Sequence, residues 1–283
     1  MERMATDPAS PATDNPAPAG RGAAPRAAGG PGGLPPFELG SAVLLGIGSG
    51  SASLWAELAG HGQLQLWTKA GPVLAMLWVL GRSRRDSYAR LLCYGLAWSA
   101  LGDVLLEVGE VGFLAGMGAF LLAHLCYLAA FVGEERRWRP LRALPFALWG
   151  GAVLAWLWPG LEAAGMTVPV TIYTAVICAM MWRAVARAEL PGPSPPKEGS
   201  SLRPRARASL DISIGLAIAG SLTFAASDTL IAVRRFGEPA GPGAAVAFTV
   251  SILLLYWLGQ LGLMGSAMAR RPSPSASSAP GRG

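Results

Sequence analysis

The chain has few charged residues, and this scarcity argues against an ordinary soluble fold. Only 14% of its 283 residues are charged, while 52% are hydrophobic. Soluble domains usually carry about 25% charged residues. A chain with so few charges cannot cover a water-exposed surface, but it suits an environment made mostly of lipid. We therefore expect an integral membrane protein.

Cysteine and histidine are also scarce, and each shortage argues against a type of site. Cys93, Cys126 and Cys178 are odd in number and lie inside apolar runs without metal-ligand spacing, so no disulfide framework is expected. The two histidines, His61 and His124, are too few and too far apart for a histidine-rich zinc site. No metal and no cofactor are predicted, which counts against the zinc-dependent membrane amidases.

Acidic residues are fewer than basic ones, 17 against 23, which gives a formal net charge of +6. In a soluble protein this balance could indicate nucleic-acid binding. Here the basic residues fall in short loops between apolar runs, where the positive-inside rule explains them better. No nucleic-acid partner is predicted.

What the sequence does contain is a series of apolar runs that approach the length of a membrane span. A helix needs about 20 residues to cross about 30 Å of hydrocarbon, and only helices satisfy their own backbone there. We predict an all-α fold, a polytopic bundle of about eight transmembrane helices within residues 37–269. The second and fifth runs are short. The runs are 38–57, 66–81, 89–108, 113–133, 143–158, 167–187, 210–232 and 244–268.

The loops between these runs alternate in charge, which predicts the orientation of the helices. Loops on one side carry Glu110, Glu162 and Glu238, with Arg234 and Arg235 as basic exceptions. Basic loops on one side of an even number of helices place both termini in the cytoplasm. The basic residues that flank or fill the links after runs two, four and six are Arg82, Arg84, Arg85, Arg90, Arg136, Arg137, Arg139, Arg142, Arg183, Arg187, Lys197, Arg203, Arg205 and Arg207.

Three segments have few large apolar residues and are not expected to pack. Residues 1–36 are rich in Pro, Ala and Gly and are predicted to be a disordered cytoplasmic tail. Residues 188–209 form a Pro/Ser/Arg linker that we expect to be flexible and to rest on anionic headgroups. Residues 270–283 form a second disordered tail, and no soluble domain is predicted. The first apolar run comes late and is expected to be a retained helix, not a cleaved signal.

Ionisable and polar residues inside the predicted helices are the candidate functional residues, because such residues are costly in lipid. In the predicted topology several fall in the non-cytoplasmic half, at similar depth on four helices, which suggests one shared cavity. Two carboxylates there could perform acid/base catalysis, one held protonated by burial and the other kept ionised by a lysine. The candidates are Lys69, Asp103, Glu107, His124, Tyr173, Ser227, Asp228, Tyr256 and Gln260.

Structural roles would explain the same residues without any chemistry. Asp103 and Lys69 could form a structural ion pair, and Glu107 could be an interfacial residue beside its loop. His124 could be a hydrogen-bonded packing residue. Tyr173 and Tyr256 could be packing or interfacial aromatics, and Gln260 could bridge helices.

Six short motifs, in order from the second run to the eighth, resemble a known family of membrane proteins. The motifs are Lys69-Ala70-Gly71-Pro72, Gly102-Asp103-Val104-Leu105-Leu106, residues 113–131 (FLAGMGAFLLAHLCYLAAF), Pro169-Val170 with Tyr173, Ala226-Ser227-Asp228-Thr229-Leu230 with Phe236, and Tyr256 with Gln260. With these motifs the sequence resembles the YhhN-like membrane proteins, whose characterised members are lysoplasmalogenases. It departs at Ala70-Gly71, at Trp257 after Tyr256, in the long N-terminal tail and in the 188–209 linker. None of these departures touches Lys69, Asp103 or Asp228.

The resemblance implies hydrolysis of the vinyl ether bond of a lysophospholipid, releasing a fatty aldehyde and glycerophosphoethanolamine or glycerophosphocholine. A vinyl ether hydrolyses when an acid protonates its β-carbon and a nearby anion stabilises the resulting cation. On this hypothesis Asp103 and Asp228 are catalytic, one as proton donor and the other as stabilising base. Lys69 would tune a carboxylate or hold the phosphate, and Tyr173 and His124 would orient groups or relay protons.

Other functions stay open at this point. The same polar cluster could couple a small-molecule or ion transporter, although no internal repeat is evident. It could also be structural in a non-enzymatic lipid-binding protein, or serve a hydrolase of ester or amide lysolipids. The Ala/Gly/Pro/Arg-rich composition suggests a GC-rich bacterial source, and so a multi-pass protein of the bacterial inner membrane surrounded by its lipids.

Overall fold

The computed structural model of the chain describes residues 34–84, 86–189, 202–238 and 241–270. Almost all of the predicted N-terminal tail 1–36 and C-terminal tail 270–283 lie outside these residues, as does the middle of the predicted 188–209 linker.

The described residues form helices throughout, with no strand, which confirms the predicted all-α fold class. Seven helical stretches are long and apolar enough to cross a membrane, and they correspond to seven of the eight predicted runs. The helices are α1 (Pro36–Ala59), α2 (Gly62–Thr68), α3 (Gly71–Ser83), α4 (Ser87–Leu106), α5 (Glu110–Glu134), η1 (Pro140–Ala143), α6 (Leu144–Ala163), α7 (Thr167–Ala186), η2 (Arg187–Glu189), α8 (Leu202–Phe236) and α9 (Pro242–Met268).

The predicted second span, 66–81, is not one continuous helix; α2 and α3 are separated by a turn at Lys69 and Ala70. Pro72 has no N–H to donate to the carbonyl of Thr68 four residues earlier, so that helical hydrogen bond is lost. The hydroxyl of Ser49 in α1 donates to the Thr68 carbonyl instead, at 2.6 Å. Gly71 allows this approach, because a Cβ there would overlap the Ser49 side chain. With 13 residues, α3 rises about 20 Å and does not cross the hydrocarbon alone.

The helix α8 begins earlier than the sequence predicts. Residues 202–209 were expected to belong to the flexible linker, but they are the first turns of α8, so the prediction is wrong for them. An ion pair between Arg207 and Asp211, 2.9 Å apart and one turn apart, supports this extension. Ser209 also hydrogen-bonds the carbonyl of Ala269 at the end of α9.

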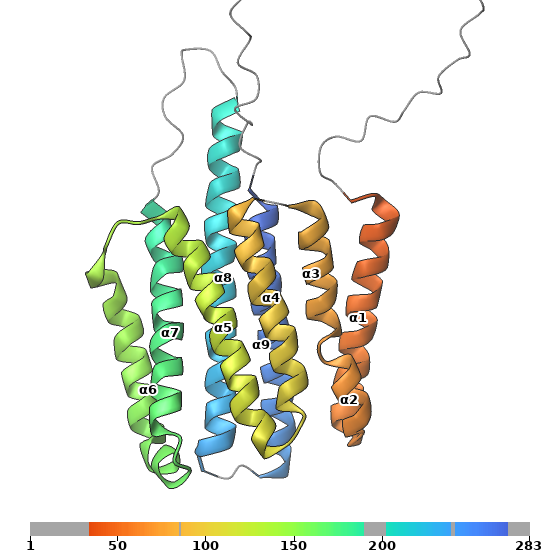
Figure 1. Cartoon of the computed structure of the whole chain (residues 1–283), viewed down its shortest axis with the longest axis vertical. Helices are drawn as coiled ribbons and strands as arrows, with labels where there is room; N and C mark the ends of the chain where they lie inside the picture. Colours follow the sequence, from red (N-terminus) through yellow and green to blue (C-terminus); the bar gives the residue numbers. More distant parts are fainter. Residues whose placement is uncertain (1–33, 85, 190–201, 239–240, 271–283) are drawn as a thin grey trace, which may run out of the picture. The chain divides into compact units, whose positions relative to one another are not determined.

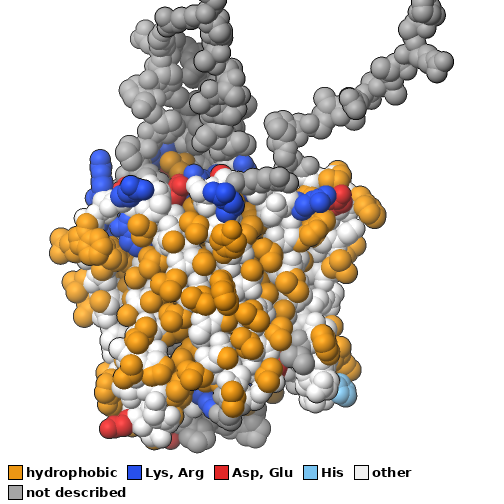
Figure 2. All heavy atoms as spheres, viewed as in Figure 1, with side chains coloured by type: hydrophobic (Ala, Val, Ile, Leu, Met, Phe, Trp, Pro, Cys, Tyr) orange, Lys and Arg blue, Asp and Glu red, His pale blue; other side chains and the backbone are white. Residues whose placement is uncertain are grey.

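The long helices run alternately up and down, so α1 begins and α9 ends at the same end of the bundle (Figure 1). Arginine and lysine side chains gather at this end, whereas the middle of the visible face is covered by hydrophobic side chains (Figure 2). We call the end that holds Arg82, Arg84, Arg90 and Arg187 the basic end. The cytoplasmic placement of the basic end stays a prediction, based on the positive-inside rule.

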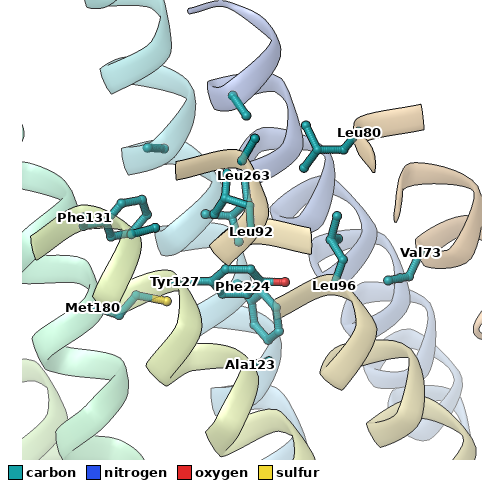
Figure 3. Packing of buried hydrophobic residues seen from close by; sticks show 14 of the residues in the cluster. Val73, Leu80, Leu92, Leu96, Ala123, Tyr127, Phe131, Met180, Phe224 and Leu263 are labelled. Carbon is teal, nitrogen blue, oxygen red and sulfur yellow. The ribbon is translucent and has the colours of Figure 1, made fainter. Parts of the chain in front are cut away.

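The core lies between α4, α5, α8 and α9, where Leu92, Leu96, Tyr127, Phe224 and Leu263 are fully buried (Figure 3). Glycines let these helices approach closely. Gly95 and Gly102 of α4 leave room for the aromatic rings of α5, and Gly220 of α8 lies against the backbone of α9. Such small-residue contacts are a common way for helices to pack in membranes.

We expect the Gly220→Ala substitution to destabilise the bundle, because the new Cβ would lie 2.8 Å from backbone atoms of Gly259 and Leu263. Overpacking of this kind costs about 1–3 kcal/mol. Gly215 lies on the same helix with open space around it, so Gly215→Ala is the matched control. Thermal unfolding in detergent should show a lower Tm for the first variant only. Equal Tm values for both variants would contradict the close α8–α9 contact.

Candidate active site

The break between α2 and α3 places a cation at the end of the bundle opposite the basic end. The Nζ of Lys69 lies 2.7 Å from Oε1 of Glu107, the residue that follows α4. The two side chains are 14% and 20% exposed, so the pair is shielded but not sealed. The sequence suggested an ion pair between Lys69 and Asp103, but in the structure Lys69 pairs with Glu107. Glu107 is not a lone interfacial carboxylate.

Asp103 lies on α4, one turn before Glu107, and Asp103 is only 1% exposed. The hydroxyl of Tyr256 in α9 donates a hydrogen bond of 2.7 Å to its Oδ2. Lys69 and Glu107 are both close enough to interact with Asp103 electrostatically. Tyr256 is thus a direct partner of a buried carboxyl group, not only a packing aromatic.

Asp228 of α8 has two partners from other helices. The hydroxyl of Tyr173 in α7 donates a hydrogen bond of 2.9 Å to Oδ2 of Asp228. The Nε2 of His124 in α5 lies 3.4 Å from the same oxygen, and the histidine is fully buried. Asp228, Tyr173 and His124 therefore form one compact cluster contributed by three helices.

The contact made by the other ring nitrogen of His124, Nδ1, indicates which of the two nitrogens carries a hydrogen. Nδ1 lies 2.6 Å from the backbone carbonyl of Phe120, and a carbonyl oxygen can only accept. We infer that Nδ1 carries a hydrogen, so Nε2 is the nitrogen left to exchange a proton with Asp228. Burial disfavours separated charges, so a neutral carboxylic acid beside a neutral imidazole is the less costly arrangement.

The two carboxyl groups lie within one interior region. Asp103 is near enough to Asp228 to interact with it electrostatically. Aromatic rings fill the space around them. The centre of the Phe224 ring lies 4.6 Å from the centre of the His124 ring and 5.4 Å from the centre of the Tyr256 ring. Phe120 also packs against Tyr256, at 5.7 Å. Aromatic walls of this kind keep water out and strengthen the electrostatic interactions between the groups they enclose.

An apolar cavity opens beside Asp228 and Tyr173. Asp103 is not among the residues that line it, so the cavity reaches one carboxyl group and not the other. Most of the wall is apolar, and Tyr173, Thr174, Asp228 and Thr229 provide its polar groups. Its lining residues are Leu106, Phe113, Met117, Phe120, Trp149, Val153, Leu154, Leu157, Val170, Tyr173, Thr174, Ile177, Asp228, Thr229, Ile231, Ala232 and Phe236.

Two of the predicted residues have partners outside these clusters. The hydroxyl of Ser227 donates to the carbonyl of Ile252 in α9, at 2.9 Å, and so joins two helices. The side-chain oxygen of Gln260 accepts a hydrogen bond of 2.7 Å from the hydroxyl of Tyr127, while its Nε2 has no hydrogen-bond partner among the described residues. Tyr127 was not among the predicted site residues. Its position three residues after His124, on nearly the same helix face, was the signal available in the sequence.

The chemical groups gathered here are carboxyls, phenols, one imidazole and one ammonium. Within the described parts of the chain, no three His, Cys, Asp or Glu side chains are grouped so that they could hold a metal ion. The arrangement can donate protons and stabilise positive charge through the side chains themselves.

The fold and the site define a class of protein: a multi-pass helical membrane protein whose acidic side chains, from separate helices, gather beside an apolar cavity. The chain belongs to the YhhN family, whose model matches residues 64–267. This range runs from α2 to α9 and contains all nine candidate residues. The resemblance described from the sequence motifs is thereby confirmed.

Several curated relatives carry the same name. The chain is 33% identical over 193 residues to proteins named lysoplasmalogenase from Mycobacterium bovis and Mycobacterium tuberculosis. Each alignment covers 64% of this chain and 63% of the relative, so the chain matches less than two thirds of their length. It is 31% identical over 209 residues to the human protein named lysoplasmalogenase TMEM86B, covering 73% of this chain and 76% of the relative. No solved structure matches the chain.

Proposed function

We propose that the chain is a membrane lysoplasmalogenase, an ether hydrolase that cleaves the vinyl ether bond of a lysoplasmalogen. The products are a fatty aldehyde and glycerophosphoethanolamine or glycerophosphocholine. One observation carries the proposal: Asp228, held by Tyr173 and beside His124, lines an apolar cavity within the membrane span. The names of the curated relatives support it. We further propose the bacterial inner membrane as its location, with both termini in the cytoplasm.

In the first step of the proposed reaction Asp228 protonates the β-carbon of the vinyl ether. The C=C electron pair forms the new C–H bond, and the α-carbon becomes an oxocarbenium-like cation. Asp228 is the candidate donor because it lines the cavity, whereas Asp103 does not. The Tyr173 hydroxyl orients the carboxyl group, and the neutral imidazole of His124 lies beside it.

In the second step water adds to the cation, and the hemiacetal collapses to the aldehyde and the alcohol. The Asp228 carboxylate, left after proton transfer, accepts the proton of the attacking water. Asp103, which does not line the cavity, contributes negative charge and is oriented by the Tyr256 hydroxyl. Charge placed before the reaction in a water-poor site stabilises a developing cation strongly.

The substrate would span the cavity and the Lys69–Glu107 pair. Apolar residues of α5, α6 and α7 would hold the alkenyl chain. Leu106 lines the cavity, and Glu107, the next residue, carries the ion pair with Lys69. Lys69 would bind the phosphate of the headgroup as a point charge.

We expect Lys69→Gln to raise KM for lysoplasmalogen about tenfold or more while kcat changes little. Losing a charge-assisted hydrogen bond costs about 1.5–3 kcal/mol, and a group that holds the phosphate binds substrate and transition state alike. Steady-state aldehyde release measures both constants. Arg90→Gln removes an exposed cation at the basic end and serves as the control. An unchanged KM in Lys69→Gln would rule out this role.

The proposed function itself is tested by offering purified protein three lysolipids in parallel, with alkenyl, alkyl and acyl chains. We expect aldehyde release from the alkenyl lipid alone, since only a vinyl ether forms a stabilised cation on carbon protonation. Fatty-acid release from the acyl lipid would instead indicate an ester hydrolase. No product from any of the three would overturn the proposal.

A transporter is the second candidate function, and the α2–α3 break is the observation that favours it. Interrupted helices with a charged residue at the break often contribute to solute-binding sites in transporters. Solute flux in proteoliposomes without lipid turnover would support a transporter. Aldehyde release without flux would support the hydrolase.

A further inference from the structure

A second group of charged side chains lies at the basic end, away from the candidate active site. Arg187, the first residue of η2, is fully buried. Its Nη1 donates a hydrogen bond of 3.0 Å to the hydroxyl of Tyr88. Its guanidinium lies over the rings of Tyr88 and Phe131, at 4.8 Å and 5.3 Å from their centres. The flat face of the cation is thus well packed.

One edge of the same guanidinium has no hydrogen-bond acceptor among the described residues. Nε and Nη2 of Arg187 are buried and have no hydrogen-bond partner within the described parts of the chain. These two nitrogens are neighbours on one edge of the plane, the edge that binds two oxygens of a phosphate or carboxylate at once. No ion-pair partner of Arg187 exists among the described residues. Burying a cation without a counter-ion costs free energy, so an anion bound at this edge would stabilise the structure.

Arg270 brings a second cation to the same place. Its guanidinium also lies over the Tyr88 ring, at 4.6 Å, so the two cations are within about 10 Å of each other. Nη2 of Arg270 pairs with Glu134 at 3.0 Å, and Nη1 has no hydrogen-bond partner among the residues that the structure describes. The side chains of this pair are 25% and 20% exposed, which makes Arg270 the outward side of the cluster.

We propose that Arg187 and Arg270 form a binding site for a phosphate group at the basic end of the bundle. Nε and Nη2 of Arg187 would donate to two phosphate oxygens, and Nη1 of Arg270 would donate to a third. Phosphate suits this site because it is compact, carries enough oxygens for three donors, and neutralises the excess positive charge. The chemistry fits the headgroup of an anionic phospholipid and also a free phosphate ion. The site is separate from the proposed lysoplasmalogenase chemistry.

The test compares thermal unfolding of the full-length protein in nanodiscs of phosphatidylcholine with and without phosphatidylglycerol. A parallel arm in phosphatidylcholine discs compares inorganic phosphate with chloride at equal ionic strength. We expect a rise in Tm of at least about 4 °C from phosphatidylglycerol, from phosphate, or from both, because a ligand of the native state stabilises it. Stabilisation by phosphatidylglycerol alone identifies a lipid headgroup, and stabilisation by phosphate as well identifies a site open to the free ion.

Variants then assign the effect to the site. Arg187→Gln should abolish the rise in Tm, and Arg187→Lys, which keeps the charge but loses the two-pronged edge, should remove most of it. Arg90→Gln, at an exposed position of the same end, should keep the full rise. If Arg187→Gln does not fold, the wild type, Arg187→Lys and Arg270→Gln still decide the question. No rise in the wild type, or an equal loss in Arg90→Gln, would overturn the proposal.

Discussion

Replacing Asp228 with asparagine is expected to lower kcat for aldehyde release by about 10²–10⁴-fold, the usual contribution of a positioned general acid. Asparagine keeps the size of the side chain and can still accept a hydrogen bond from Tyr173, which now reaches Oδ2 at 2.9 Å. It has no acidic proton to give to the β-carbon. The loss should therefore appear in kcat, with little change in KM and no change in folding.

Glu162→Gln provides the control for Asp228→Asn, because Glu162 is exposed at the end of α6 and lies outside the cavity. Tyr173→Phe should show a smaller loss, since it removes the orienting hydroxyl and leaves the acid in place. Normal turnover in a well-folded Asp228→Asn variant would remove Asp228 from the mechanism. The identity of the cleaved substrate is tested separately, by the comparison of alkenyl, alkyl and acyl lysolipids.

Asp103→Asn is expected to have the second largest effect, a fall in kcat of about 10²-fold or more. Asp103 is 1% exposed and outside the cavity wall, so it would act on the cation by its charge and not by contact. Neutralising a preorganised charge removes stabilisation that exists mainly in the transition state, so KM should change little. Kinetic constants measured beside Asp228→Asn give the comparison.

Tyr256→Phe tests the same idea from the partner's side. Its hydroxyl donates to Oδ2 of Asp103 at 2.7 Å, so the variant frees the carboxylate without removing its charge. We expect kcat to fall by about tenfold, less than for Asp103→Asn. If both variants unfold at the wild-type temperature and turn over normally, Asp103 is a structural residue of α4.

The sequence predicted most of the helices because each apolar run forms its own hydrogen bonds in lipid, whatever surrounds it. The α2–α3 break was missed because it depends on a distant residue. Pro72 signals a lost hydrogen bond, but many membrane helices tolerate proline. The break is stable here because Ser49 of α1 supplies the missing donor to Thr68.

Candidate site residues could be found from the sequence because polar groups are rare in these helices, but their pairing could not. Asp103 and Glu107 lie one turn apart, so from the sequence either could pair with Lys69. In the structure the break between α2 and α3 positions Lys69 so that it pairs with Glu107. Tyr127 was missed because a tyrosine in a membrane helix can be a simple packing residue, and its hydrogen-bond contacts with Gln260 and Ser99 depend on how distant helices meet. The Arg187 edge was invisible in the sequence, where this arginine is one of many basic loop residues.

The position of the cavity has a consequence for how the proposed products would leave. Its wall is almost entirely apolar, and charged groups lie next to wall residues: the guanidinium of Arg235 lies over the ring of Phe113 at 5.0 Å, and Lys69 pairs with Glu107, the residue after Leu106. A long-chain aldehyde released there is soluble in hydrocarbon and can diffuse sideways into the bilayer. The glycerophospho-alcohol is soluble in water and would instead leave toward the aqueous phase. Cleavage would thus sort one amphiphile into two compartments, so removal of the polar half alone could keep the reaction moving forward.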